Sequence, residues 1–311
     1  MIKLIADSTC DLSDEIVKKY DVGIAPLSIT IDGKTYQDRI DINADQFFSK
    51  IAEYKTHPTT AMPSPALFIE RFEEAYNKGQ KEILCICMSS KTSGSYQSAV
   101  IAKEYFEEEH KVVDYKIHVV DSTCMSHGSG WLIVKSARMI ENGATFEEVV
   151  EYVELRKRNV KHFLSVDDLD NLVRSGRLRY GSALIGKIMK VKPIMTMKQG
   201  EGAIISKERG RKAVLKHYID GFNMRVDPEE TDFVIVGYTS DKLYAENLVN
   251  LIKDQTSFKG DILLMQMGVA VGTHVGLGGL SFFFLEKPNN KDGLLFNNLN
   301  KIKEVIEKKE H

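Results

Sequence analysis

The sequence predicts an α/β protein made of two units, each a mostly parallel sheet flanked by helices. Short apolar segments of strand length alternate with helical segments through most of the chain, which is typical of parallel sheets covered on both faces. Hydrophobic residues make up 43% and charged residues 28% of the 311 residues, the balance of a globular protein with a sizeable core. A chain of this length accommodates two domains, and we place them at 1–158 and 159–311.

The first unit is expected to alternate strands and helices from its first residues. Asp32-Gly33 is a hairpin signal, and Asn142-Gly143 separates two helices. The expected strands are Ile2–Ala6, Gly23–Thr30, Lys34–Gln37, Ile83–Met88 and Lys116–Val120, and the expected helices are Ser13–Tyr20, Asn43–Glu53, Ser64–Asn77, Ser95–Glu108, Ser126–Glu141 and Thr145–Lys157.

The second unit is expected to contain a hairpin around Gly200-Glu201-Gly202 and a glycine-rich, flexible stretch at Gly268–Gly279. Its expected strands are Phe163–Val166, Lys192–Met197, Ile204–Ser206, Phe233–Gly237, Ile262–Met265 and Leu280–Leu285. Its expected helices are Asp168–Arg174, Ala183–Met189, Arg211–Phe222 and Leu243–Asp254, with a charged helical tail from Asn298.

Composition excludes several function classes. The net charge of −2 gives no electrostatic reason to expect a nucleic-acid partner. No apolar run approaches the roughly 20 residues of a membrane helix, and the N-terminus is a strand pattern rather than a signal peptide, so we expect a cytoplasmic protein. The four cysteines have no metal-ligand spacing. We therefore expect reduced thiols, no metal and no cofactor.

The most informative segment is a buried strand that runs into a hydroxyl-rich turn and then a helix, at Ile83–Ala99. A helix N-terminus offers free backbone N–H groups and a partial positive charge, which suit an anion. Ser89, Ser90, Thr92, Ser93 and Ser95 add neutral donors. Helix capping alone is the alternative, but it needs only one or two hydroxyls. The turn therefore predicts a site for a carboxylate or phosphate.

Two other features lie where open α/β sheets bind ligands. The tetrapeptide Asp7–Cys10 is repeated at Asp121–Cys124, and each copy follows an apolar strand; local capping is the competing interpretation. His274 and Thr273 lie among glycines that allow close backbone approach to a ligand.

Two basic turns, Arg174–Arg179 and Lys207–Lys212, are solvated surface by default, although arginine suits carboxylate or phosphate binding.

A set of short motifs, in order along the chain, resembles the DegV family, the fatty-acid-binding component of bacterial fatty-acid kinases. The motifs are Ala6-Asp7-Ser8-Thr9, Pro26-Leu27, Thr60-Ala61-Met62-Pro63-Ser64, Ser89–Ala99, Val120-Asp121-Ser122, Asp167-Asp168-Leu169, Ser175-Gly176-Arg177-Leu178, Val191-Lys192-Pro193-Ile194 and Gly272-Thr273-His274. The resemblance runs to about residue 285. It implies two α/β domains, with one long-chain fatty acid bound and phosphorylated to acyl-phosphate by a separate kinase subunit for phospholipid synthesis.

The same resemblance implies which residues hold the ligand. The family's threonine, serine and histidine fall on Thr60, Ser93 and His274. Gly94, Ser95 and Thr273 adjoin them, and an arginine directed at the carboxyl falls on Arg209 or, with a shifted alignment, Arg211. The sequence departs from the family in two places: Thr60-Ala61-Met62-Pro63-Ser64 stands where Thr-Ser-Gln-Pro-Ser is usual, and Leu277 where a proline commonly follows the histidine.

Two alternatives stay open from the residues themselves. Ser93 and His274 could be the nucleophile and base of an acyl hydrolase, although G-x-S-x-G is absent. The anion-friendly turn could instead bind a sugar phosphate or nucleotide, although the chain has no P-loop. On the fatty-acid interpretation the chain is not an enzyme. We expect a monomer that meets a kinase subunit, and transient contact with a membrane surface is left open.

Overall fold

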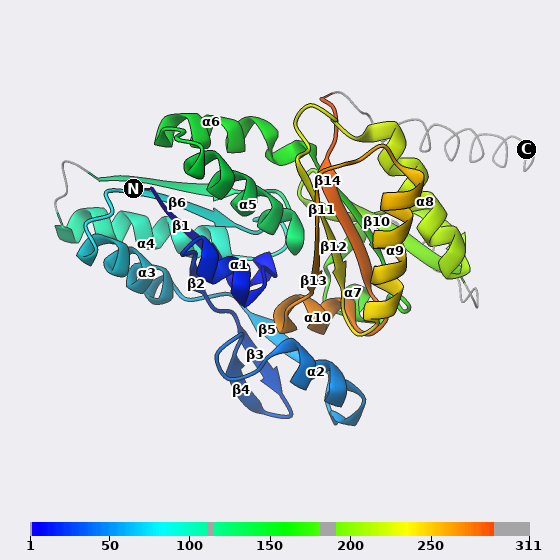
Figure 1. The fold of residues 1–311 in the computed structure, drawn as a ribbon. Coiled ribbons are helices and arrows are strands. Elements are labelled where there is room, and N and C mark those ends of the chain that lie inside the picture. Colours follow the sequence, from blue (N-terminus) through cyan, green and yellow to red (C-terminus); the bar gives the residue numbers. More distant parts are fainter. Residues whose placement is uncertain (1, 111–114, 181–190, 289–311) are drawn as a thin grey trace, which may run out of the picture.

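The computed structural model describes residues 2–110, 115–180 and 191–288. Within them the chain forms a four-stranded, a seven-stranded and a three-stranded sheet, surrounded by helices. Figure 1 shows the two larger sheets side by side, with the small sheet projecting below the first. The predicted α/β fold with two main sheets is confirmed, whereas the boundary at residue 158 stays a prediction.

The first sheet is entirely parallel and has the order β2-β1-β6-β7. Side chains alternate along β1, so Leu4 and Ala6 pack in one apolar cluster and Ile5 in another on the opposite face. The strands are β1 (Ile2–Asp7), β2 (Gly23–Ala25), β6 (Glu82–Cys87) and β7 (Lys116–Asp121). The helices are α1 (Asp14–Lys19), α3 (Pro65–Asn77), α4 (Ser95–His110), α5 (His127–Glu141) and α6 (Phe146–Arg156), with the 3₁₀ turns η1 (Ser8–Cys10) and η3 (Lys157–Asn159).

A small antiparallel sheet, β4-β3-β5, corrects the expectation of one strand at Gly23–Thr30. Pro26 has no N–H and interrupts the strand, so β2 stays in the parallel sheet while β3 turns away. The third strand, β5, was not predicted. The elements are β3 (Ser28–Ile31), β4 (Lys34–Gln37), β5 (Thr59–Ala61), α2 (Ala44–Lys50) and η2 (Ile51–Glu53).

The second large sheet is mixed, so the expectation of a mostly parallel sheet is wrong for this unit. Its order is β13-β12-β14-β8-β10-β11-β9, and only the pairs β12–β13 and β9–β11 are parallel. The β10–β11 hairpin closes at Gly200 as predicted, and β14 inserts antiparallel between β12 and β8. The strands are β8 (Val160–Ser165), β9 (Leu178–Tyr180), β10 (Val191–Lys198), β11 (Glu201–Arg209), β12 (Phe233–Tyr238), β13 (Asp261–Gln266) and β14 (Leu280–Leu285).

Among the described residues, four helices belong to this second unit in sequence: α7 (Asp170–Arg174), α8 (Gly210–Arg225), α9 (Lys242–Gln255) and α10 (Val269–Val275). Helices α8 and α9 cover one face of its sheet (Figure 1). The expectation of a flexible stretch at Gly268–Gly279 is corrected, because α10 occupies most of it. The helix expected at Ala183–Met189 and the tail from Asn298 lie outside the described residues.

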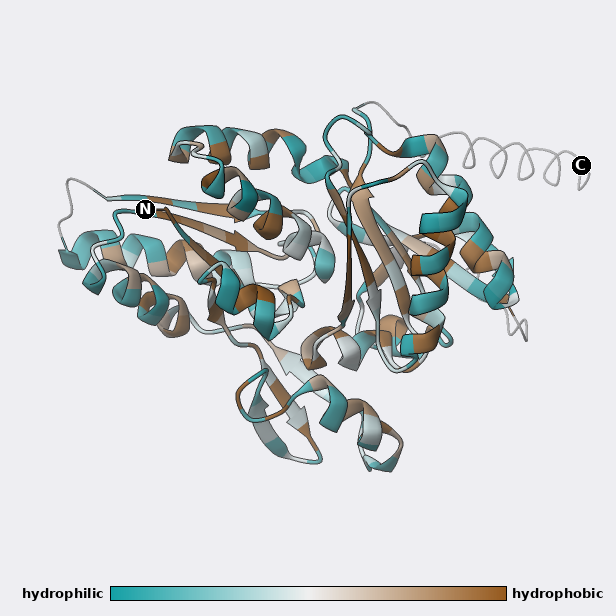
Figure 2. Cartoon of the chain, viewed as in Figure 1, coloured by the Kyte–Doolittle hydropathy of each residue, from teal (hydrophilic) through white to brown (hydrophobic). Residues whose placement is uncertain are grey.

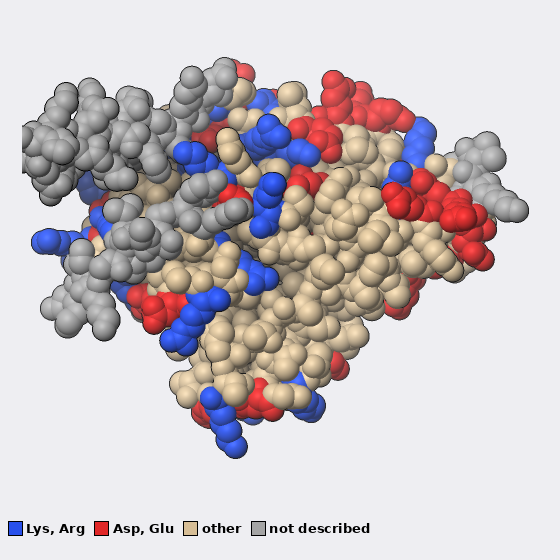
Figure 3. All heavy atoms as spheres, turned by 180° about the vertical axis from the view of Figure 1, so that it is seen from behind, with Lys and Arg blue, Asp and Glu red and all other residues tan. Residues whose placement is uncertain are grey.

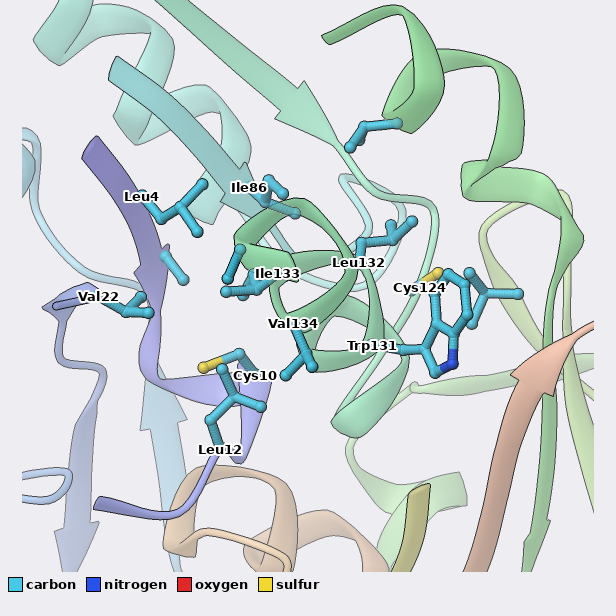
Figure 4. Close-up of a cluster of buried hydrophobic side chains, with 14 of the residues drawn as sticks. Leu4, Cys10, Leu12, Val22, Ile86, Cys124, Trp131, Leu132, Ile133 and Val134 are labelled. Atoms are coloured by element: carbon cyan, nitrogen blue, oxygen red, sulfur yellow. The ribbon is translucent and has the colours of Figure 1, made fainter. Parts of the chain in front are cut away.

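Helix α5 lies between the two large sheets and joins them into one core. Trp131 stacks on Phe233 of β12 with ring centroids 5.0 Å apart, and its indole N–H donates to the Phe233 carbonyl oxygen at 3.3 Å. Figure 4 shows Trp131, Leu132, Ile133 and Val134 among side chains of the first sheet. In Figure 2 the strands are mostly hydrophobic and the helices are hydrophilic on their outer faces. The two units therefore share a continuous apolar interior around α5.

The surface carries both signs of charge. Seen from behind, Lys and Arg side chains gather mainly on the half formed by the second unit, and Asp and Glu gather at the outer end of the first (Figure 3). None of the helices in the described ranges is long and apolar enough to cross a membrane.

A polar cavity that opens into an apolar one

The carboxyl ends of β1 and β7 hold the turn that follows β6 between them. Asp7 accepts the Met88 N–H at 2.9 Å, and Asp121 accepts the Ser90 N–H at 3.1 Å. Each aspartate also accepts the N–H two residues further along its own chain, from Thr9 and Thr123 at 3.0 Å. The repeated tetrapeptide therefore forms two matching turns that fix the start of the hydroxyl-rich segment.

That segment leads into the N-terminus of α4, as its sequence predicted. Ser93 Oγ lies 3.0 Å from Ser95 Oγ and accepts the Ser95 N–H at 3.3 Å. The buried Ser95 also hydrogen-bonds Asp7. Burial raises the pKa of Asp7, and hydrogen bonds from Thr9, Met88 and Ser95 partly offset the shift. Asp7 and Ser95 thus orient the Ser93 hydroxyl through successive hydrogen bonds.

Gly94 allows a close approach that a larger residue would block. A Cβ at this position would lie 2.1 Å from the Met62 Sδ, far inside van der Waals contact. Met62 packs here against the turn while 52% of its surface stays exposed. A thioether therefore lies at the mouth of the site.

Helix α10 brings His274 to the small sheet. His274 Nε2 lies 2.9 Å from Thr60 Oγ1 of β5, and its buried Nδ1 has no partner in the described residues. Burial lowers the pKa of His274 to about 4, helped by the positive charge of Arg177 and by His57. The imidazole is therefore neutral near pH 7, with one nitrogen paired to Thr60 and the other unsatisfied.

These groups line one cavity, which we call the polar cavity. Its empty volume is about 720 Å³, part of it open to solvent. Thr60, Ser93, Gly94, His274 and Arg177 all contribute to its wall. It thus combines hydroxyls, a neutral imidazole, an arginine and the turn that leads into α4, a set of groups that matches a carboxylate or phosphate.

A second cavity, the apolar cavity, adjoins the first and shares Met125, Arg177 and Val271 with it. Its empty volume is about 440 Å³, part of it open to solvent, and its exposed wall is almost wholly apolar. The side chains that form it come mainly from the second unit: Leu164, Leu172, Leu178, Met195, Met267 and Phe283. Because the two cavities share wall residues, a ligand with a polar head and an apolar chain could occupy both.

The structure brings together most, but not all, of the predicted site residues. Thr60, Ser93, Gly94 and His274 line the polar cavity, and Ser95 lies behind Ser93. The Thr273 hydroxyl instead donates to the Val269 carbonyl oxygen within α10 at 2.9 Å.

Neither arginine proposed for the carboxyl region reaches this cavity. Arg209 is exposed at the end of β11, and Arg211 forms an ion pair with Asp241 at 2.5 Å. The arginine in the cavity wall is Arg177, which belongs to a basic turn and to the motif Ser175-Gly176-Arg177-Leu178 but was not among the predicted site residues. A sequence motif fixes neighbours along the chain, whereas this part of the cavity wall comes from the residue that directly precedes β9 in the second unit.

The geometry does not support the hydrolase alternative. In the described residues Ser93 pairs with Ser95, and His274 pairs with Thr60 rather than with Ser93. No acidic side chain in the described part of the chain accepts a hydrogen bond from His274 to orient it as a base. The four cysteines are free and buried, and the described residues contain no cluster of metal-ligating side chains.

Comparison with known proteins identifies the family. A family model described as "Uncharacterised protein, DegV family" matches residues 1–287. A DegV domain-containing protein of Clostridium acetobutylicum is 35% identical over 286 residues, which cover 92% of this chain and 99% of that one.

Solved structures agree in fold. A Thermus thermophilus DegV family protein, described by its fatty-acid binding, is 26% identical, with a TM-score of 0.82 over 92% of this chain and 99% of that one. The Streptococcus pneumoniae Fatty Acid Kinase (Fak) B3 protein, loaded with linoleic acid, is 24% identical, with a TM-score of 0.79 over 92% of this chain and all of that one. The chain therefore belongs to the DegV family.

Proposed function

We propose that this protein binds one long-chain fatty acid, with the carboxyl group in the polar cavity and the acyl chain in the apolar cavity. The observation that carries the proposal is that a donor-rich cavity adjoins an apolar one and shares Met125, Arg177 and Val271 with it. The solved relative from T. thermophilus, which is described as fatty-acid binding, supports this assignment.

The polar cavity supplies what a carboxylate needs when it leaves water. Burying an ionised carboxylate is costly unless hydrogen bonds replace its hydration. Thr60, Ser93 and the N-terminus of α4 are neutral donors, and Arg177 adds a positive charge. With Thr60 as donor to Nε2, the unsatisfied Nδ1 of His274 would carry the proton and become a further donor.

The apolar cavity supplies the affinity. Each methylene group that leaves water contributes about 0.8 kcal/mol, so a chain of about 16 carbons has a large driving force before ordering costs are subtracted. Met125, Met195 and Met267 line this cavity. Methionine side chains are flexible and polarisable, and they adapt to irregular apolar ligands.

We further propose that the bound carboxyl is presented to a separate kinase subunit, which phosphorylates it to acyl-phosphate for phospholipid synthesis. Two features support this finer step. The polar cavity lies at the surface, where Met62 is half exposed, so that a partner could reach the carboxyl end of the ligand. The ordered motifs also resemble those of the kinase-associated members of the family.

Solvent extraction of the purified protein, followed by mass spectrometry, tests the binding proposal. We expect one fatty acid per chain, and after delipidation we expect added palmitate to raise the melting temperature. An extract without fatty acid, together with no thermal shift, would contradict the proposal. Transfer of phosphate from ATP to the bound acid, in the presence of a purified fatty-acid kinase subunit, tests the finer step separately.

A further inference from the structure

Helix α10 belongs to the second unit in sequence but packs largely on the first. The chain leaves β13, forms α10 against η1, α2, β3 and β5, and returns as β14 (Figure 1). Gly272 allows this packing, because a Cβ there would lie 2.5 Å from Cζ of Phe48. The last turn of this helix carries His274 to Thr60, so the position of α10 decides whether the polar cavity is complete.

Two buried carboxyl groups of the first unit meet the start of α10. Asp11 Oδ1 accepts the N–H of Gly268, the N-cap of the helix, at 2.9 Å, and Asp11 Oδ2 accepts the Ser126 hydroxyl at 2.6 Å. Asp38 Oδ2 accepts the Ser8 hydroxyl at 2.8 Å. The backbone N–H groups of Val269 and Ala270 favour the charged form of Asp38.

Both carboxyl groups are held in place at a cost in desolvation. Burial raises the pKa of Asp11 to about 8 and that of Asp38 to about 6, while hydrogen bonds and the nearby Arg39 act in the opposite direction. The groups that face the pair are therefore Ser8, Ser126, Arg39 and the first N–H groups of α10. Both carboxyl oxygens of Asp11 accept hydrogen bonds, whereas Asp38 Oδ1 is buried without a partner in the described residues. Asp38 instead lies beside Gly268 and Val269 in the wall of a surface pocket.

We propose that Asp38 and Asp11 are positioning residues for His274: they hold the first turn of α10 so that its last turn presents His274 to Thr60 and to the ligand carboxyl. The two aspartates do not touch the ligand site, because neither lines the polar cavity. The role of His274 toward a ligand carboxyl rests on the proposed function. The contact between the aspartates and the start of α10 is present without ligand and can be tested by itself.

The test compares ligand-free Asp38→Ala, Asp38→Asn and wild type by amide deuterium exchange and by NMR titration of His274. In Asp38→Ala we expect at least tenfold faster exchange in 268–276, with 233–238 in β12 unchanged. We also expect the pKa of His274 to move up toward its ordinary value as the ring becomes more exposed. Asp38→Asn keeps an acceptor oxygen and should stay close to wild type.

Asp227→Ala is the matched control, because Asp227 is a buried carboxyl that accepts the N–H of Glu229 far from α10. It should change neither readout. If Asp38→Ala does not fold, Ser8→Ala removes the hydroxyl that donates to Asp38 Oδ2 and accepts the Leu27 N–H, and a smaller increase in exchange of 268–276 is expected. A folded Asp38→Ala or Ser8→Ala with wild-type exchange and a wild-type His274 titration would overturn the inference.

Affinity then separates this inference from the proposed function. If wild type binds palmitate and Asp38→Ala binds it about tenfold more weakly, both are supported. If wild type binds no fatty acid, the proposed function fails while the exchange data still decide the role of Asp38. If Asp38→Ala moves α10 but binds palmitate as wild type does, the positioning role toward the ligand is wrong and only the contact between the units remains.

Discussion

The polar and the apolar cavity adjoin one another but are built in different ways. The polar cavity gathers short side chains from distant parts of the chain, each fixed by a hydrogen bond, such as Ser93 with Ser95 and Thr60 with His274. The apolar cavity is formed by flexible and branched side chains of the second sheet and its neighbouring loops. The polar cavity therefore holds its hydrogen-bonding groups in fixed directions, whereas the side chains of the apolar cavity can adapt its volume.

The difference assigns separate roles to the two cavities. A hydrogen bond between protein and ligand replaces hydrogen bonds to water, so its net contribution is only about 1 kcal/mol. Under the proposed function, the polar cavity therefore mainly orients the ligand. Apolar burial grows with chain length, so the apolar cavity mainly sets the affinity. The predictions that follow test this separation, from the largest expected effect to the smallest.

Shortening the fatty acid should have the largest effect. Replacing palmitate by laurate removes four methylene groups, which corresponds to about 3 kcal/mol, or about two orders of magnitude in affinity. Competition against a fluorescent fatty acid measures the difference. Equal affinity for both acids would show that the apolar cavity does not hold the end of the chain.

The pH dependence of stability isolates His274 in the polar cavity. Its pKa is about 4 in the folded protein and returns to its ordinary value near 6.5 on unfolding. The unfolded state therefore binds more protons in this window, and the free energy of unfolding falls as the pH drops from about 6.5 to about 4.

The size of this effect is bounded by the shift, at most about 3 kcal/mol. The variant His274→Gln should lose this part of the pH dependence in urea titrations of the delipidated protein. Burial also lowers the pKa values of His127 and His162. Both histidines are present in wild type and in His274→Gln, so their contributions to the pH dependence cancel when the two proteins are compared. Parallel curves for the two proteins would contradict a neutral His274.

Removing the imidazole should weaken binding less than shortening the chain does. We expect His274→Ala to bind palmitate about tenfold more weakly, since one hydrogen bond to a charged group contributes about 1.5 kcal/mol. His118→Ala is the control, because His118 pairs with Glu154 on the surface, away from both cavities. A loss that is the same for palmitate and for its methyl ester would indicate a general disturbance rather than a lost contact with the carboxylate.

Ser93→Ala should have the smallest effect, about fivefold, because Ser95 and the N–H groups of α4 remain. Ser49→Ala, which removes an exposed hydroxyl that bonds within α2, controls for the substitution type. Isothermal titration of both variants with palmitate makes the comparison. A Ser93→Ala variant weaker than His274→Ala would mean that the serine, not the histidine, is the main partner of the carboxyl.

Most of the parallel sheet could be predicted from the sequence because local signals determine it. Apolar strands, the Asp32-Gly33 hairpin and the hydroxyl-rich turn before α4 all came from short segments. Thr60, Ser93 and His274 were identified through the family motifs, and the structure places all three on one cavity.

The remaining features depend on contacts that no short segment encodes. Strand β14 lies antiparallel between β12 and β8 because the chain returns from α10, and strand direction depends on that path. Helix α10 forms within a glycine-rich stretch because first-unit carboxyls and Phe48 support it. Arg177, which directly precedes β9, contributes to the cavity wall, whereas Arg209 at the end of β11 does not.

The most direct test of the account is a crystal structure with palmitic acid that carries bromine on its terminal carbon. The account predicts an anomalous peak in the apolar cavity, near Met195 and Phe283, with the carboxyl beside Thr60 and His274. A bromine peak beside Thr60, or at the surface with the apolar cavity closed, would contradict it.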